Sequence, residues 1–71
     1  MMQSLIVFTE TVETSVAPKR ALKAAEECLI GIRVVESRKE AAMWLYEYEV
    51  KGEIGKIRKF AGRIKGLEIM D

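Results

Sequence analysis

The chain has 71 residues, enough for one small domain, which excludes an enzyme built from two domains around a cleft. Its 12 basic and 11 acidic side chains leave a net charge of +1, so overall charge favours neither nucleic acid nor an acidic membrane surface as a partner. The chain has no histidine and one cysteine, Cys28. These counts exclude an internal disulfide, Ser-His and Cys-His catalytic pairs and a tetrahedral zinc site.

The predicted location is the cytoplasm, without insertion into a membrane. No apolar run approaches the roughly 18 to 20 residues of a membrane span, and the segment 1–9 has no basic start or small-residue cleavage site. A lone cysteine removes the usual reason to place a small domain in an oxidising compartment. Abundant Glu and Lys beside few amide side chains are typical of hyperthermophile proteins.

The first predicted elements are a strand over 4–9 and a helix over 16–28. The strand segment is β-branched and aromatic without helical spacing, and the Thr- and Glu-rich stretch after it is typical of a loop. Ser15 is a suitable helix cap, and Pro18 is tolerated in a first turn. One face of this helix would carry Ala21, Leu22, Ala25, Cys28 and Leu29.

A hairpin is predicted next. The segment 30–35 alternates as a strand, the polar stretch 36–40 has the length of a turn, and 42–50 alternates strictly with period two. A second helix is predicted from Ile54, with Gly66 in the left-handed position that ends many helices.

The segment 67–70 completes the prediction as a short last strand, which gives the order βαββαβ. Two βαβ halves with right-handed crossovers form an α+β ferredoxin-like sandwich, a four-stranded antiparallel sheet in the order 4-1-3-2 with two helices on one face. The whole chain, 1–71, would be a single domain of this kind. A helical bundle is discounted because it would require a helix in the alternating segment 42–50.

The alternation also predicts which side chains face the helices: Trp44, Tyr46, Tyr48 and Val50, together with Ile6, Phe8, Ile32 and Ile69. The uncovered face would then carry Glu47 and Glu49 beside an apolar set of Leu5, Val7, Val35, Met43 and Leu45. Contiguous exposed apolar patches are rare on monomers, so this set predicts a homo-oligomer interface between stacked sheets. The alternative is that loops cover part of the face and the rest is ordinary surface.

The opposite orientation would expose three aromatic rings, like an RNA-binding sheet. It is disfavoured because it would bury Glu47 and Glu49 under the helices without cations to pair with both. On the open face these two carboxylates have a spacing that suits acid/base chemistry or a hard cation, but ion pairing with Arg33 and Lys51 is the commoner arrangement. We therefore predict no catalytic residues, no metal site, no cofactor and no enzyme activity.

A basic stripe on the second helix supports an alternative function. Lys56, Lys59 and Arg63 are spaced three and four residues apart and so align on one face. The stripe could contact an anion or a nucleic-acid backbone without reading sequence, or it could be a solvated helix face. Lys19 and Arg20 near the start of the first helix could similarly hold a small anion.

The segment 54–69, IGKIRKFAGRIKGLEI, resembles the end of small ACT-like regulatory domains, in which a helix of the pattern I-G-x-I … G-R-I-x-G leads into the last strand. The resemblance implies a dimeric or tetrameric module that senses a small-molecule effector or mediates assembly. Ligand-binding ACT domains usually carry glycine and a polar amide after the first strand, whereas 9–17 has neither Gly nor Asn. The histidine clusters of nickel-sensing relatives are also absent.

Overall fold

The structure, a computed structural model, describes residues 6–69 in full and the backbone of Met70. Its elements are β1 (Phe8–Thr14), α1 (Pro18–Glu27), β2 (Gly31–Glu40), β3 (Met43–Gly52) and α2 (Ile54–Met70). The three strands form one antiparallel sheet in the order β1-β3-β2, so β3 is central and pairs on both sides. The fold is α+β with the order βαββα.

The predicted fourth strand over 67–70 is wrong, because this segment is the last part of α2. The sequence order βαββαβ and the four-stranded ferredoxin-like sheet are therefore corrected to three strands and two helices. Helical spacing continues past the predicted end, since Ile57, Phe60 and Ile64 are buried and Leu67 packs against the same core. Gly66 does not end the helix, because no glycine among residues 6–70 has a positive φ.

The first strand lies later in the sequence than the predicted segment 4–9. β1 starts at Phe8 and includes the Thr- and Glu-rich stretch that predicts a loop. Threonine and valine are β-branched residues that suit a strand, and β1 pairs with β3 along its full length, from Phe8 opposite Gly52 to Thr14 opposite Tyr46. Of the predicted strand 4–9, residues 4 and 5 lie outside the described residues.

The hairpin turn is also displaced from its predicted place. The polar stretch 36–40 belongs to β2, and the turn consists of Ala41 and Ala42. Ala41 has a φ of 54°, in the left-handed region that usually selects glycine or asparagine. A bulge between Val34 and Glu36 leaves Val35 without a partner on β3.

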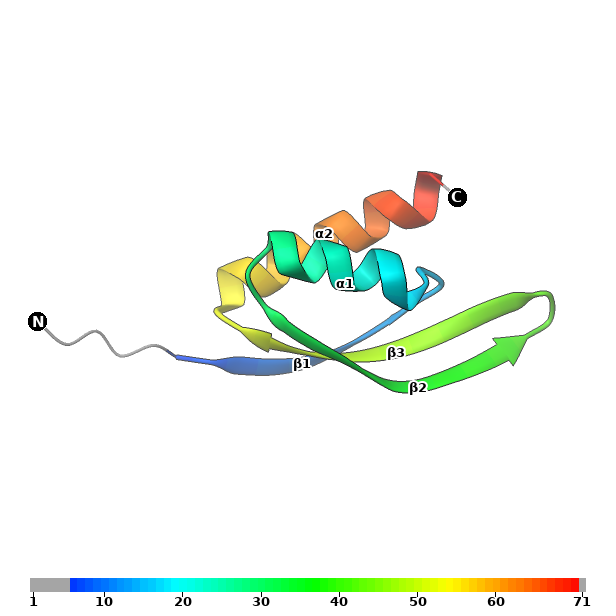
Figure 1. Cartoon of the computed structure of the whole chain (residues 1–71), viewed down its shortest axis with the longest axis horizontal. Coiled ribbons are helices and arrows are strands. Elements are labelled where there is room, and N and C mark those ends of the chain that lie inside the picture. The colour runs from blue at the N-terminus through cyan, green and yellow to red at the C-terminus, as the bar shows by residue number, and fades with distance from the viewer. Residues whose placement is uncertain (1–5, 71) are drawn as a thin grey trace, which may run out of the picture.

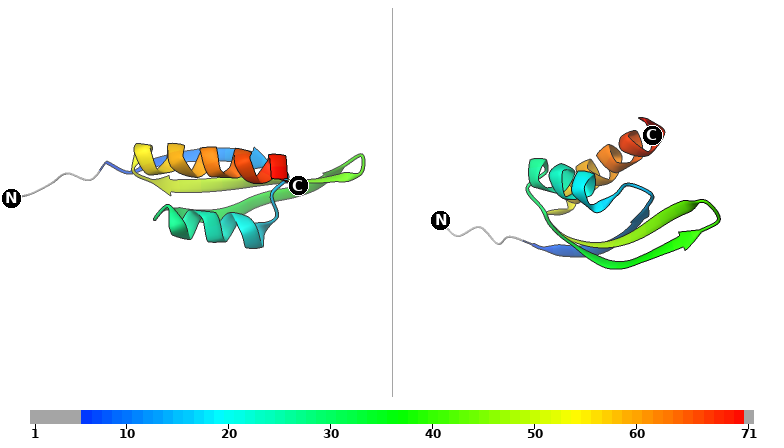
Figure 2. Two further views of the ribbon diagram at one scale, coloured as in Figure 1. Left: turned by 90° about the horizontal axis from the view of Figure 1, so that it is seen from above. Right: turned by 45° about the vertical axis from the view of Figure 1, so that its right-hand side comes forward.

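Both helices lie on one face of the sheet, where α2 packs on β1 and β3 and α1 packs on β2 (Figures 1 and 2). The prediction that Tyr48 and Val50 face the helices is confirmed, since both are 0 % exposed. The core between the layers consists of Val16, Ala21, Ala24, Ala25, Cys28, Tyr48, Val50, Ile57, Phe60 and Ile64.

The β2–β3 hairpin extends beyond the ends of both helices (Figures 1 and 2). Residues 36–46, which contain the turn and the adjoining strand ends, are called the hairpin arm below. Exposure changes along β3 accordingly: Met43 and Trp44 are exposed, Leu45 to Glu47 are half-buried, and Tyr48 is buried. The hairpin arm therefore places side chains outside the layer that the helices cover.

Candidate functional site

The face of the sheet opposite the helices is charged at its centre. Glu49 of β3 lies opposite Arg33 of β2, and Arg33 Nε donates a hydrogen bond of 2.9 Å to Glu49 Oε1. This bond lowers the pKa of Glu49 and raises the pKa of Arg33. Glu49 is therefore held as a carboxylate, which does not suit it to act as a general acid near neutral pH.

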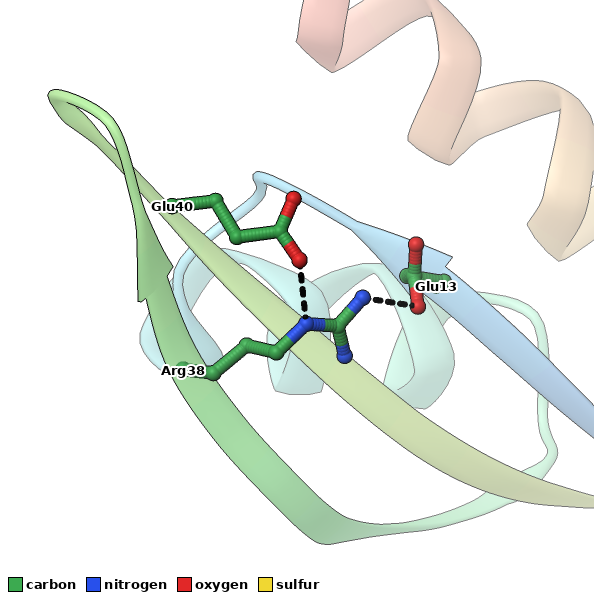
Figure 3. Close-up of polar contacts among 3 residues, drawn as sticks. All are labelled: Glu13, Arg38 and Glu40. Carbon is green, nitrogen blue, oxygen red and sulfur yellow. Dashed lines mark hydrogen bonds and ion pairs between the residues drawn. The ribbon is translucent and has the colours of Figure 1, made fainter.

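A row of three carboxylates crosses the same face, because the register places Glu13 of β1 and Glu36 of β2 on either side of Glu47. Arg38 offsets part of this negative charge (Figure 3). Its Nη2 donates to Glu13 Oε2 at 2.7 Å and its Nε donates to Glu40 Oε2 at 2.7 Å. The two bonds raise the pKa of the Arg38 guanidinium, and the bond to Glu13 joins β1 to the hairpin arm.

The predicted oligomer-interface residues do not form one patch. Val7 precedes β1, and Phe8 after it pairs with Gly52 at the end of β3 remote from the hairpin turn. Val35 is the unpaired residue of the bulge and is 47 % exposed. Leu5 lies outside the described residues. The charged centre of the face described above separates Val7 from the apolar side chains near the turn.

Met43 and Leu45 are the two predicted interface residues that the structure brings together. They line an open hollow of about 460 Å³ with Glu40, Ala41 and Ala42 at the end of the hairpin arm. Met43 is 55 % exposed, and Leu45 is half-buried. The two predicted interface residues that lie together are therefore at the end of the hairpin arm.

A row of aromatic rings follows the other face of β3 into the hairpin arm. Trp44 stacks on Tyr46 with ring centroids 6.5 Å apart, and Tyr46 stacks on Tyr48 at 6.1 Å. Tyr48 is fully buried, but Trp44 is 50 % exposed. The sequence correctly placed these side chains on the helix-facing side by alternation, but it did not show that Trp44 lies beyond the helices.

Three other side chains predicted to face the core are exposed. Ile6 precedes β1 and is 65 % exposed, while Ile69 lies in the last turn of α2 and is 85 % exposed. Phe8 pairs with Gly52 near the end of the sheet and is 41 % exposed. Those predictions depended on a first strand over 4–9 and on a fourth strand at the carboxyl end.

The basic stripe on α2 is partly neutralised by ion pairs within the chain. Lys56 Nζ lies 3.2 Å from Glu53 Oε1, and Arg63 pairs with Glu27 of α1. Lys59 between them is exposed. A nucleic-acid backbone would have to compete for two of the three cations, and we do not propose this function.

Among residues 6–70, no group of three or more His, Cys, Asp or Glu side chains is arranged to hold a metal ion. In the same part of the chain, no helix is both long and apolar enough to cross a membrane. Cys28 is a free thiol, 4 % exposed, and belongs to the core, as expected for a small buried apolar side chain.

Comparison with protein families, curated proteins and solved structures finds no match to this chain. The segment that resembles ACT-like domains, 54–69, lies in one continuous helix instead of a helix followed by a strand. The candidate sites therefore rest on the geometry of the chain's own residues, and the end of the hairpin arm is the main one.

Proposed function

We propose that the chain is a small assembly module that pairs with a second copy of itself through the end of its hairpin arm. The observation that carries this proposal is apolar exposure on both faces of that end. Met43, 55 % exposed, and Trp44, 50 % exposed, are neighbours on a strand and so point to opposite faces. The apolar tip, as we call this surface, consists of Ala41, Ala42, Met43, Trp44 and Leu45.

The hydrophobic effect supplies the driving force. Transferring a large apolar side chain from full exposure to full burial stabilises a complex by about 1.5 to 3 kcal/mol. Trp44 and Met43 are already half buried within the single chain, so burying each of them adds only part of this free energy. In a symmetric dimer, both copies make this contribution. Because association itself costs several kcal/mol, we expect a dimer that dissociates in the micromolar range or above.

Charge favours a second copy over a nucleic acid. The hairpin arm carries Glu36 and Glu40 against Arg38 and Lys39, so it has no net charge. A nucleic acid would require an excess of cations. In a two-fold symmetric dimer, in contrast, the same surface of each copy faces the other copy. A surface that carries both positive and negative side chains can then pair opposite charges across the symmetry axis.

The small core supports the same proposal. Four of the ten core residues are alanine or cysteine, which are small. Both helices cover the same face of the three-stranded sheet, so the other face is uncovered (Figure 2). Chains of this length bury a limited fraction of their surface, and oligomerisation is a common supplement. The resemblance to ACT-like domains adds a regulatory role for the assembly, in the cytoplasm, in response to a small-molecule effector.

Sedimentation velocity of matched variants tests the proposal. Leu45→Glu places a charge in the apolar tip and should weaken self-association about ten-fold or more, because the carboxylate would lose water without gaining a partner. Leu22→Glu is the control, since Leu22 is 48 % exposed on α1, away from the hairpin arm. Circular dichroism should show that both variants remain folded. Equal association of the two variants, or a monomeric wild type at millimolar concentration, would refute the proposal.

A further inference from the structure

Within the described residues, the sheet has two edge strands, β1 and β2, which differ in how well they are protected. β2 carries a bulge at Val35 and five charged side chains, one of which is Lys39. Bulges and charged side chains, lysine above all, keep an edge strand from pairing with another chain. β1 pairs with β3 without a bulge along its seven residues and contains no lysine, arginine or proline. The outer edge of β1 is therefore open to a further strand.

Two apolar residues just before β1 have no strand partner. Phe8 lies opposite Gly52, where β3 ends, so β3 reaches neither Ile6 nor Val7. Ile6 is 65 % and Val7 is 62 % exposed, and both are β-branched residues that suit a strand. The described chain runs into β1 from beyond the end of β3 (Figure 1). Residues 6 and 7, called the overhang below, therefore lie in line with the open edge.

We propose that β1 and the overhang pair in antiparallel orientation with the same segment of a second copy, centred on Thr9. The residues that face each other across the two-fold axis are then Thr9 with Thr9, Ile6 with Val12, Val7 with Thr11 and Phe8 with Glu10. No two like charges lie directly opposite each other in this register. Both residues of the overhang gain a β-branched neighbour, which is a favourable cross-strand pair.

The order of residues in β1 distinguishes this register from its neighbours. A pair centred on Glu10 would place two carboxylates directly opposite each other, which is unfavourable. A pair centred on Thr11 would leave the overhang beyond the end of the other copy's β1. A pair centred on Phe8 would place the apolar Ile6 opposite Glu10. The register centred on Thr9 avoids all three of these faults.

The edge contact would join two sheets into one of six strands, in the order β2-β3-β1-β1-β3-β2, with the helices of both copies on one face. The hairpin turn lies beyond the end of β1 at Thr14, because Thr14 pairs with Tyr46. Since the two β1 strands are antiparallel, the two hairpin arms point in opposite directions and both apolar tips stay free. The edge contact does not rest on the tip contact, and the two together would link copies into a chain-like assembly.

We expect the edge contact to be the weaker of the two, with dissociation at about millimolar concentration or above, because it buries few large side chains. Cysteine cross-linking at millimolar concentration in the Leu45→Glu background, in which the tip contact is weakened, tests the register. Thr9→Cys and Thr11→Cys each place a thiol on the same face of the same strand, and both threonines are exposed. Cys28 is 4 % exposed and should stay reduced in both variants.

The two cysteine variants differ in distance across the axis. Directly opposite Cβ atoms lie about 4.5 to 5.5 Å apart, close to the spacing of a disulfide, whereas the two copies of residue 11 would be about 13 Å apart along the strands. With diamide as the oxidant, Thr9→Cys should form the cross-linked dimer about ten-fold faster than Thr11→Cys. Equal rates, or faster cross-linking of Thr11→Cys, would overturn the proposal.

Hydrogen exchange of the unsubstituted chain gives an independent measurement. The backbone amides over 6–12 that point away from β3 should exchange several-fold more slowly at millimolar than at micromolar concentration, because pairing supplies them with acceptors. The amides at the outer edge of β2 should show no such change.

Two exchange results would overturn the edge contact: protection of β1 that does not depend on the concentration of the chain, or protection that appears only when an unrelated strand-forming peptide is added. The second result would assign the edge to a foreign strand. Failure of the edge contact would leave the comparison of Leu45→Glu with Leu22→Glu unchanged, and failure of the tip contact would leave the cross-linking preference unchanged.

Discussion

The hydroxyl group of Tyr48 donates a hydrogen bond of 2.7 Å to the backbone carbonyl of Val16, and both residues are 0 % exposed. The bond joins the central strand to the segment between β1 and α1. Thr14 lies beside this segment, accepts a hydrogen bond of 3.2 Å from the amide of Val16 and donates one to Glu68 of α2. These polar contacts thus connect the sheet to α2 and to the segment that precedes α1.

Tyr48 should make the fold sensitive to alkaline pH. Burial raises the pKa of its hydroxyl to about 12, with a smaller contribution from Tyr46. The unfolded chain releases this proton near pH 10, whereas the folded chain retains it, so stability is complete below pH 10 and falls as the pH rises to about 12. The loss should be on the order of 2 to 3 kcal/mol.

Urea unfolding of the wild type and of Tyr48→Phe at a series of pH values measures this loss. The variant should be about 1 to 3 kcal/mol less stable at neutral pH, because it leaves the carbonyl of Val16 without its donor. It should also lose less stability than the wild type between pH 10 and 12. If the free energy of unfolding falls equally with pH in the two proteins, the pKa of Tyr48 does not differ between the folded and the unfolded chain.

Leu29 ends α1 in an unfavourable conformation, which gives a second prediction. It has a φ of 59°, and the amides of Leu29 and Ile30 donate to the carbonyls of Glu26 at 3.2 Å and Ala25 at 3.1 Å. This is the hydrogen-bond pattern of a Schellman cap, whose left-handed residue is usually glycine. Because Leu29 is 73 % exposed, Leu29→Gly should lose little packing and stabilise the fold by up to about 1 kcal/mol. A lower thermal midpoint for this variant would contradict the account.

Glycine substitutions provide the third prediction and test the corrected end of the chain. A Cβ on Gly66 would meet no atom within 4 Å, and Gly66 lies inside α2. Gly66→Ala should therefore stabilise the fold by about 0.5 to 1 kcal/mol. In the left-handed helix end that the sequence predicts, the same change would destabilise it.

Gly52→Ala is the matched contrast. Its Cβ would lie 2.8 Å from Cγ2 of Ile30, so the segment before β2 would have to move. We expect a destabilisation of about 1 to 3 kcal/mol. Chemical unfolding of both alanine variants gives the comparison, and a destabilised Gly66→Ala would support a helix end at that position.

The Arg33–Glu49 pair gives a fourth prediction. The hydrogen bond from Arg33 lowers the pKa of Glu49, so this carboxylate contributes stability above its unfolded pKa and loses that contribution as the pH falls. Carboxyl ¹³C NMR should find Glu49 titrating below the usual value for glutamate. Arg33→Gln should raise the pKa of Glu49, and no change in that variant would show that another group is responsible.

The alternation of β3 and the first helix were predictable from sequence for physical reasons. Tyr46 to Val50 alternate between apolar and charged side chains, a period of two that has no helical equivalent, and the buried Tyr48 and Val50 follow from it. The helix over 16–28 is close to α1 because Ala21, Ala25 and Cys28 form one apolar face. Ion pairing of Glu47 and Glu49 with Arg33 and Lys51 is the commoner arrangement expected from sequence, and the structure shows one such pair, Arg33 with Glu49.

The errors came from short segments and from turn chemistry. The segment 67–70 is too short to show a period, and its helical state is supported by a contact from distant sequence, Thr14 with Glu68. The Ala41–Ala42 turn lacks the Asn-Gly or Asp-Gly signal of a tight hairpin, so the polar stretch before it resembled the turn. The longer hairpin moves Trp44 out of the core, and no local pattern in the sequence reveals this.

Fluorescence of Trp44 during dilution, recorded beside the sedimentation mass, tests self-association through the apolar tip most directly. Trp44 is the single tryptophan of the chain, so its emission reports on this surface alone. If the tip is the contact between copies, dilution from millimolar to submicromolar concentration should shift the emission to the red with the same midpoint as the fall in mass. A dimer that dissociates while the emission stays constant, or a monomer at every concentration, would contradict it.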